Sequence, residues 1–138
     1  MNLFLEKKDP KKVIHEDISH MRGKAKSKRM SRLVSAWIRR IIRERMEFKI
    51  VAQGGSLLEA VNCSHSSRIC PICGWVARGN RNGNRFKCQF CGYTAESDYT
   101  AAMEILRREK DSDIRIWTHR DQVYKTLLQR FRRQAVTE

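Results

Sequence analysis

The spacing of apolar residues changes several times along the chain, and each change predicts a different element. A β-branched run at residues 13–18 predicts a short strand, whereas apolar residues at helical spacing from 33 to 46 predict an amphipathic helix of about four turns. Two short apolar runs, 48–52 and 57–61, predict strands on either side of a Gly-Gly turn. Helical spacing returns at 98–110 and at 119–134. The pattern therefore predicts a mixture of short strands and helices.

A cysteine-rich stretch lies between the predicted strand at 57–61 and the predicted helix at 98–110. Four cysteines form two Cys-x-x-Cys turns separated by 14 residues: Cys70, Cys73, Cys88 and Cys91. Two thiolates on one tight turn span one edge of a tetrahedron, so two such turns are typical of a four-cysteine zinc site. A glycine after each turn permits a positive φ, and Asn82-Gly83 is a strong hairpin signal between them. The stretch is predicted to be a zinc ribbon.

Other roles for the cysteines are less consistent with the sequence. A disulfide framework or a redox-active Cys-x-x-Cys would explain the pairs, but no signal peptide is visible and Cys63 is a fifth, odd cysteine. Cys63 and His65 are potential extra ligands; with four better-spaced cysteines available, Cys63 is expected to be a buried thiol and His65 a loop residue. The aromatic residues of this stretch are expected to pack over the metal core, although stacking on bases is an alternative.

The charge of the chain indicates the class of its partner. The net charge of +14 and the pI near 10.1 indicate a polyanionic partner, most often nucleic acid, with an acidic membrane surface as the competing interpretation. No apolar run has transmembrane length. The basic residues of the first half are predicted to contact phosphates, although a merely solvated helix face would look the same. These residues are Arg22, Lys24, Lys26, Lys28, Arg29, Arg32, Arg39, Arg40 and Arg43.

Four motifs together resemble the C-terminal end of the transposon-encoded TnpB proteins and of the related compact type V CRISPR effector nucleases. They are V-I-x-E-D-I-S at 13–19, S-S-R-x-C-P-x-C-G at 66–74, F-x-C-x-x-C-G at 86–92 and D-x-x-A-A-x-x-I at 98–105. The resemblance implies an α/β fold, a partial RNase H/RuvC-like sheet with an inserted zinc ribbon. It also implies that Glu16 and Asp98 are catalytic carboxylates and that Asp17 is a solvated neighbour. Thr100 stands where the family usually has asparagine, a mild departure.

The resemblance divides the chain into four parts. Residues 1–61 would be a partial RuvC-like region, 62–95 the zinc ribbon and 96–110 the last RuvC-like helix. Residues 111–138 depart from the family core. They are expected to form a helical C-terminal appendage that packs on the domain or on a partner. The family also has a first catalytic aspartate upstream of the glutamate. Asp9 does not fit that role, because it precedes Pro10 and lies too close to Glu16.

The function implied by this resemblance is part of a transposon-associated, RNA-guided DNA endonuclease. Zn²⁺ would be structural and Mg²⁺ catalytic. DNA, a guide RNA and a protein supplying the N-terminal nuclease half in trans would be partners, and the location would be the cytoplasm of a prokaryotic cell, near the nucleoid. Three alternatives stay open: a non-catalytic zinc-ribbon protein that binds DNA or RNA, a remnant of an interrupted transposon gene, and a protein–protein adaptor.

Overall fold

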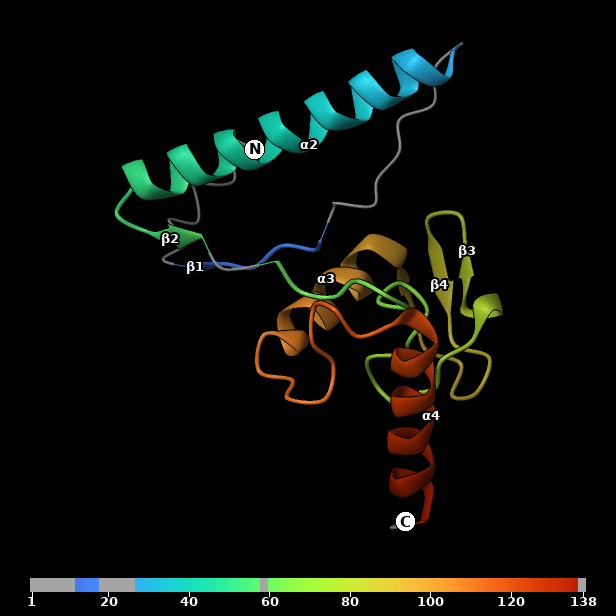
Figure 1. The fold of residues 1–138 in the computed structure, drawn as a ribbon. Helices are drawn as coiled ribbons and strands as arrows, with labels where there is room; N and C mark the ends of the chain where they lie inside the picture. The colour runs from blue at the N-terminus through green and yellow to red at the C-terminus, as the bar shows by residue number, and fades with distance from the viewer. Residues whose placement is uncertain (1–11, 18–26, 58–59, 137–138) are drawn as a thin grey trace. The chain divides into compact units, whose positions relative to one another are not determined.

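The computed structural model describes residues 12–17, 27–57 and 60–136, and the chain divides into two compact units, Met1–Ala60 and Val61–Glu138 (Figure 1). In the first unit, strand β1 (Lys12–Val13) pairs in parallel with strand β2 (Ser56–Leu57). Helix α2 (Lys28–Ala52) lies between them in the chain and packs next to β2. The strand expected at 13–18 is thus two residues long in the described part of the chain, and the strand expected at 57–61 begins one residue early.

Helix α2 is longer than the sequence pattern predicts. Its N-cap is Ser27, whose side chain accepts a hydrogen bond from the Met30 amide at 3.2 Å. The predicted strand at 48–52 is wrong, because the helix continues to Ala52. Ile50 is 2% exposed and follows Met46 by four residues, so the helical apolar spacing extends through this β-branched run. The helix ends where Gly54 takes φ +75° and the Gly55 amide donates to the Ile50 carbonyl.

The apolar stripe of α2 is only partly covered by the described residues. Ile50 is buried and Val34, Ile41 and Met46 are half-buried, in line with an inward-facing stripe. Two other residues expected on that stripe are exposed, Leu33 by 57% and Trp37 by 65%. Among the side chains that the structure describes, the helix therefore has a narrower buried face than its sequence suggests.

The second unit begins with the ribbon. Strands β3 (Arg81–Asn82), β4 (Arg85–Lys87) and β5 (Thr94–Glu96) form an antiparallel sheet in chain order, preceded by the short 3₁₀ helix η1 (Arg78–Asn80). Gly83 takes φ +58° at the tip between β3 and β4, which confirms the predicted hairpin. Phe86 at the centre of β4 is 1% exposed and packs against Cys70 and Cys88. Trp75 and Tyr93 are partly buried against this cluster, so the ribbon core is built from cysteines and aromatic rings.

Helix α3 (Ser97–Arg108) follows β5 without a loop. Its N-cap is Glu96, so Asp98 lies in the first turn. The Ser97 amide donates to the Asn84 carbonyl at 2.9 Å, which joins the start of the helix to the hairpin. Thr100, at the family's asparagine position, is fully buried, and its hydroxyl donates to the Ser97 carbonyl at 2.8 Å.

Helix α4 (Arg120–Val136) confirms the last predicted helix and packs on the ribbon unit. A second core joins the two ends of this unit: Ile69, Val76, Ile114, Val123 and Leu127. The preceding loop is fastened to α4, since Arg130 donates from both guanidinium nitrogens to Asp111 at 2.6 and 2.7 Å. The C-terminal segment therefore contributes to the same core as the ribbon.

The described strands and helices confirm the α/β class. In the described residues the strands make one parallel pair and one three-stranded antiparallel sheet. The RNase H/RuvC-like sheet and the four-part domain division stay predictions.

Candidate functional site

The two Cys-x-x-Cys turns have the same backbone geometry. In each, the amide of the first cysteine donates to the carbonyl five residues on, at 2.9 Å from Cys70 and 2.8 Å from Cys88. The glycine after each turn donates back to the first cysteine's carbonyl, at 3.0 Å from Gly74 and 3.1 Å from Gly92. Both glycines take a positive φ, +74° and +76°, as the sequence predicted. The local sequence therefore builds two matching turns that present their sulfurs to one point.

The four sulfurs form a compact cluster. All four Sγ atoms lie within 4.8 Å of one another; Cys70 and Cys91 are 3.6 Å apart, as are Cys73 and Cys88. A tetrahedral zinc ion with bonds of about 2.3 Å to sulfur has sulfur–sulfur edges of about 3.8 Å, so the cluster fits zinc. The separations are far beyond a disulfide bond of about 2.05 Å, and none of the five cysteines is in a disulfide. Cys63 lies outside the cluster and is half-buried, where the sequence predicted a buried thiol.

Burial and hydrogen bonding shift the pKa values of the cysteine thiols in opposite directions. Burial raises the pKa of the Cys70 and Cys73 thiols. A hydrogen bond with the Tyr93 backbone instead lowers the pKa of Cys91 to about 7. Buried thiolates are unfavourable without a positive partner, and a divalent cation bound by all four would offset that cost. Because the protein supplies all four positions of a tetrahedron, the site fits a structural zinc ion.

Asn80 is a key residue of the ribbon that sequence reasoning missed. It is 1% exposed, and its Nδ2 donates to the carbonyls of Arg68 at 2.9 Å and Trp75 at 3.2 Å. Its Oδ1 accepts from the Gln89 amide at 3.0 Å, so one side chain joins the first cysteine turn to the second. The sequence has three asparagines in this loop at similar spacing, and nothing local distinguishes the buried one.

The two candidate catalytic acids belong to different units. Asp98 has a side chain that is 74% exposed, and its Oδ1 lies 3.3 Å from the Arg81 guanidinium on β3. Glu16 is exposed in the first unit, beside a half-buried Asp17 that was expected to be solvated. Among the described residues, the four cysteines make the only cluster of three or more metal-ligating side chains. The pairing of Glu16 with Asp98 therefore stays a prediction.

The predicted nucleic-acid contacts concentrate on α2. Its exposed basic residues among the predicted contacts are Lys28, Arg29, Arg32, Arg40 and Arg43. Spacings of four and eleven residues bring most of them to neighbouring positions around the helix. Arg40 pairs with Glu44 at 2.7 Å, an exposed pair one turn apart that contributes little stability. Arg39 lies within the same helix, whereas Arg22, Lys24 and Lys26 lie outside the described residues.

Comparisons with known proteins agree on one family. The family model "Cas12f1-like, TNB domain" matches residues 40–105. A TnpB-like protein of Aquifex aeolicus is 32% identical over 93 residues, which cover 64% of this chain and 30% of that protein. The CRISPR-associated endodeoxyribonuclease Cas12f1 of Sulfoacidibacillus thermotolerans is 33% identical over 76 residues, covering 54% of this chain and 18% of that protein. The chain thus spans about a third or less of these relatives.

A solved structure supports the fold. Cas12f1 in a complex with single guide RNA and target DNA matches with a TM-score of 0.53 and 24% identity, over 74% of this chain and 29% of the Cas12f1 chain. In the part of this chain that the structure describes, each helix is too short or too polar to cross a membrane.

Proposed function

This chain is a TnpB-like protein related to the compact type V effectors, and on that premise we propose that it forms part of a metal-dependent DNA endonuclease guided by RNA. In this proposal it provides the zinc ribbon, two of the metal-binding carboxylates and a basic helix for nucleic acid. Further carboxylates come from polypeptide outside these 138 residues, whether joined to this chain or separate.

The observation that carries the proposal is the rigid attachment of Asp98 to the zinc ribbon. Strand β5 ends at Glu96 and Asp98 lies two residues later, in the first turn of α3. The Ser97 amide is bonded to the hairpin at Asn84, and Arg81 of β3 contacts the Asp98 carboxylate. The fold of the ribbon therefore sets the position of this acid. Functional side chains are typically held in their working position by supporting elements of this kind.

The chemistry assigned to the acids is hydrolysis of a phosphodiester. Glu16 and Asp98 would hold Mg²⁺, which when bound supplies positive charge to the phosphate and lowers the pKa of a bound water. The role of Asp98 itself is to present an ionised carboxylate at a fixed place on the ribbon. Arg81 neutralises part of that charge and orients it from the β3 side.

The nucleic-acid partner is proposed from charge and exposure. The net charge is +14, and α2 presents five exposed basic residues from Lys28 to Arg43. Guanidinium groups donate in pairs to phosphate oxygens, so this face suits a DNA or RNA backbone.

The test is a cleavage assay in Mg²⁺ on single- and double-stranded DNA, with the chain alone and with the chain co-expressed with the reading frame immediately upstream. We expect cleavage in the co-expressed sample and its loss in Asp98→Asn and in Glu16→Gln, at unchanged zinc content. Arg85→Gln, an exposed change on β4, is the control that should leave cleavage intact. Cleavage that persisted in Asp98→Asn would refute the role of this acid.

A non-catalytic nucleic-acid-binding module is the second candidate. It is favoured by the Arg81–Asp98 contact and by the lack of a carboxylate cluster among the described residues. In that case the Asp98→Asn and Glu16→Gln variants would bind nucleic acid as the parent does, and no sample would cleave DNA. Salt-resistant binding to a protein partner would instead point to a protein–protein adaptor, since phosphate-driven binding to nucleic acid weakens steeply with salt.

A further inference from the structure

A basic cavity lies within the second unit, and its lining includes neither the four cysteines nor Asp98. It has a volume of about 350 Å³ and is lined by Arg68, Arg78, Arg120, His65 and Tyr124, among others. Arg68 precedes the first cysteine turn, Arg78 begins η1, and Arg120 and Tyr124 lie in the first two turns of α4. Part of this cavity is thus built by α4, which lies beyond the matched residues 40–105.

The cavity gathers positive charge that the described residues do not neutralise. Arg68, Arg78 and Arg120 all line it, and within the described residues none of them has an acidic partner at ion-pair distance. Asp121 also lines it, but its carboxylate is 81% exposed and lies 3.6 Å from His119. Such a group of cations favours an anionic ligand.

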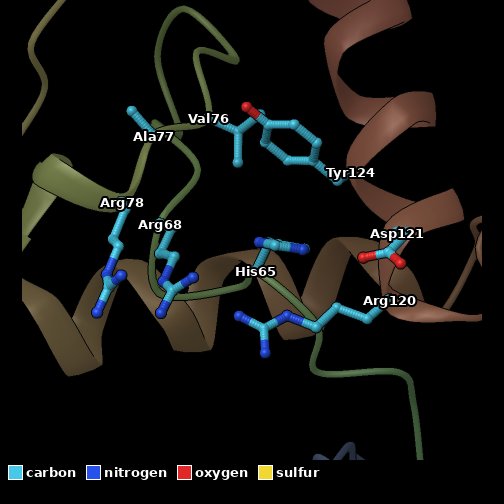
Figure 2. A pocket seen from close by; sticks show the side chains of 8 residues that line it. All are labelled: His65, Arg68, Val76, Ala77, Arg78, Arg120, Asp121 and Tyr124. Atoms are coloured by element: carbon cyan, nitrogen blue, oxygen red, sulfur yellow. The ribbon is translucent and has the colours of Figure 1, made fainter.

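The arrangement separates a cationic side from an aromatic side. Figure 2 shows the guanidinium groups of Arg68, Arg78 and Arg120 on one side of the His65 ring, and the Tyr124 ring on the other. The His65 and Tyr124 rings contact each other with centroids 5.3 Å apart. Small apolar side chains, Val76 and Ala77, line the wall beside the tyrosine.

His65 is held at this place by an uncommon backbone conformation. It has φ +62°, and its carbonyl accepts from the Arg68 amide at 2.9 Å, which orients the turn that carries Arg68. The His65 ring forms a hydrogen bond with the Arg120 backbone. Its Nε2 atom is buried and has no hydrogen-bond partner among the described residues. Buried polar atoms without a hydrogen-bond partner are uncommon in folded proteins, so this ring nitrogen marks the wall of the cavity as unusual.

From these observations we propose that the cavity binds one nucleotide of a single-stranded nucleic acid. The phosphate contacts the three arginines, because guanidinium groups match phosphate oxygens in geometry and charge. The base stacks on Tyr124 beside Val76, as bases do on aromatic side chains in single-strand binding sites. The volume is at the small end for ligand pockets and suits a single nucleotide. The proposal is independent of whether Glu16 and Asp98 take part in cleavage.

The experiment measures binding of a short fluorescent oligothymidylate to the zinc-loaded full chain by anisotropy. Arg120→Gln should weaken binding about tenfold, the usual effect of losing charged hydrogen bonds. Arg132→Gln is the matched control, since Arg132 is an exposed arginine on the same helix and outside the cavity. Tyr124→Leu should also weaken binding about tenfold through loss of stacking, with thermal unfolding and zinc content checked in parallel.

The outcomes separate this site from general electrostatics and from a free-nucleotide site. Equal losses in Arg120→Gln and Arg132→Gln would overturn the proposal, because only net charge would then matter. Tight binding of thymidine monophosphate, with oligothymidylate binding unaffected by Arg120→Gln, would also overturn it. Inorganic phosphate should compete far more weakly than thymidine monophosphate; equal competition would contradict the stacked base. The Asp98→Asn variant should bind oligothymidylate as the parent does. The binding result can therefore be interpreted even if the nuclease proposal fails.

Discussion

Replacing Asn80 with alanine should strongly destabilise the ribbon unit. The substitution removes three hydrogen bonds of 2.9, 3.2 and 3.0 Å from a side chain that is 1% exposed. The carbonyls of Arg68 and Trp75 keep backbone donors, Ala77 at 3.3 Å and Cys70 at 2.9 Å, so they are not left unpaired. The Gln89 amide loses the acceptor that Asn80 supplies.

At about 1 kcal/mol for each hydrogen bond, the free energy of unfolding should fall by about 3 kcal/mol. For a unit of this size that corresponds to a Tm lower by about 12–24 °C. The assay is thermal unfolding followed by circular dichroism, with zinc in excess so that metal supply does not limit the result.

Two further variants identify the cause of the loss. Asn80→Asp keeps the volume but turns an oxygen toward two carbonyl oxygens, so it should destabilise at least as much as Asn80→Ala. Asn84→Ala changes an exposed asparagine in the same loop and should shift stability by less than about 0.5 kcal/mol. If Asn80→Ala unfolded within that margin of the parent, the hydrogen bonds between the two cysteine turns would not stabilise the ribbon, and the reasoning would be refuted.

Three other predictions follow from the site and its surroundings. Cys88→Ser should lose zinc and unfold the ribbon, whereas Cys63→Ser should keep both, as measured by zinc content and circular dichroism; a folded, zinc-loaded Cys88→Ser protein would disprove the ligand set. Burial would raise the pKa of Asp111, but hydrogen bonds from Arg130 and two amides hold it below its usual value. A lowered pKa adds stability above the unfolded value of about 3.9 that is lost as pH falls through the folded pKa. Asp111→Asn should therefore cost about 1–2 kcal/mol at pH 7 in urea unfolding and less below about pH 4, and an equal cost at both pH values would exclude this linkage. A plot of log affinity for DNA against log salt concentration has a negative slope, and Arg43→Gln should make that slope shallower by about 1. An unchanged slope would show that Arg43 on α2 does not contact DNA phosphates.

Much of the ribbon could be predicted because its information is local. Each cysteine turn depends on a few adjacent residues: two thiols on one turn, and a glycine that can adopt φ +74° or +76°. The hairpin depends in the same way on Asn82 and Gly83. Helices α3 and α4 could be predicted because their apolar residues recur at helical spacing. That spacing identifies the buried face of a helix even when the element that covers it is unknown.

Tertiary structure decided the features that depend on what each side chain meets. The run at 48–52 is rich in β-formers, yet Ile50 continues the buried side of α2, so packing overrode local propensity. Asn80 and Asn84 are equivalent in sequence, but only one is enclosed between the cysteine turns. The sequence by itself therefore determined the four-cysteine cluster and the turns that hold it. The folded chain alone decided that α4 would complete the second core of this unit and bring Arg120 to the same cavity as Arg68, because such contacts join residues far apart in sequence.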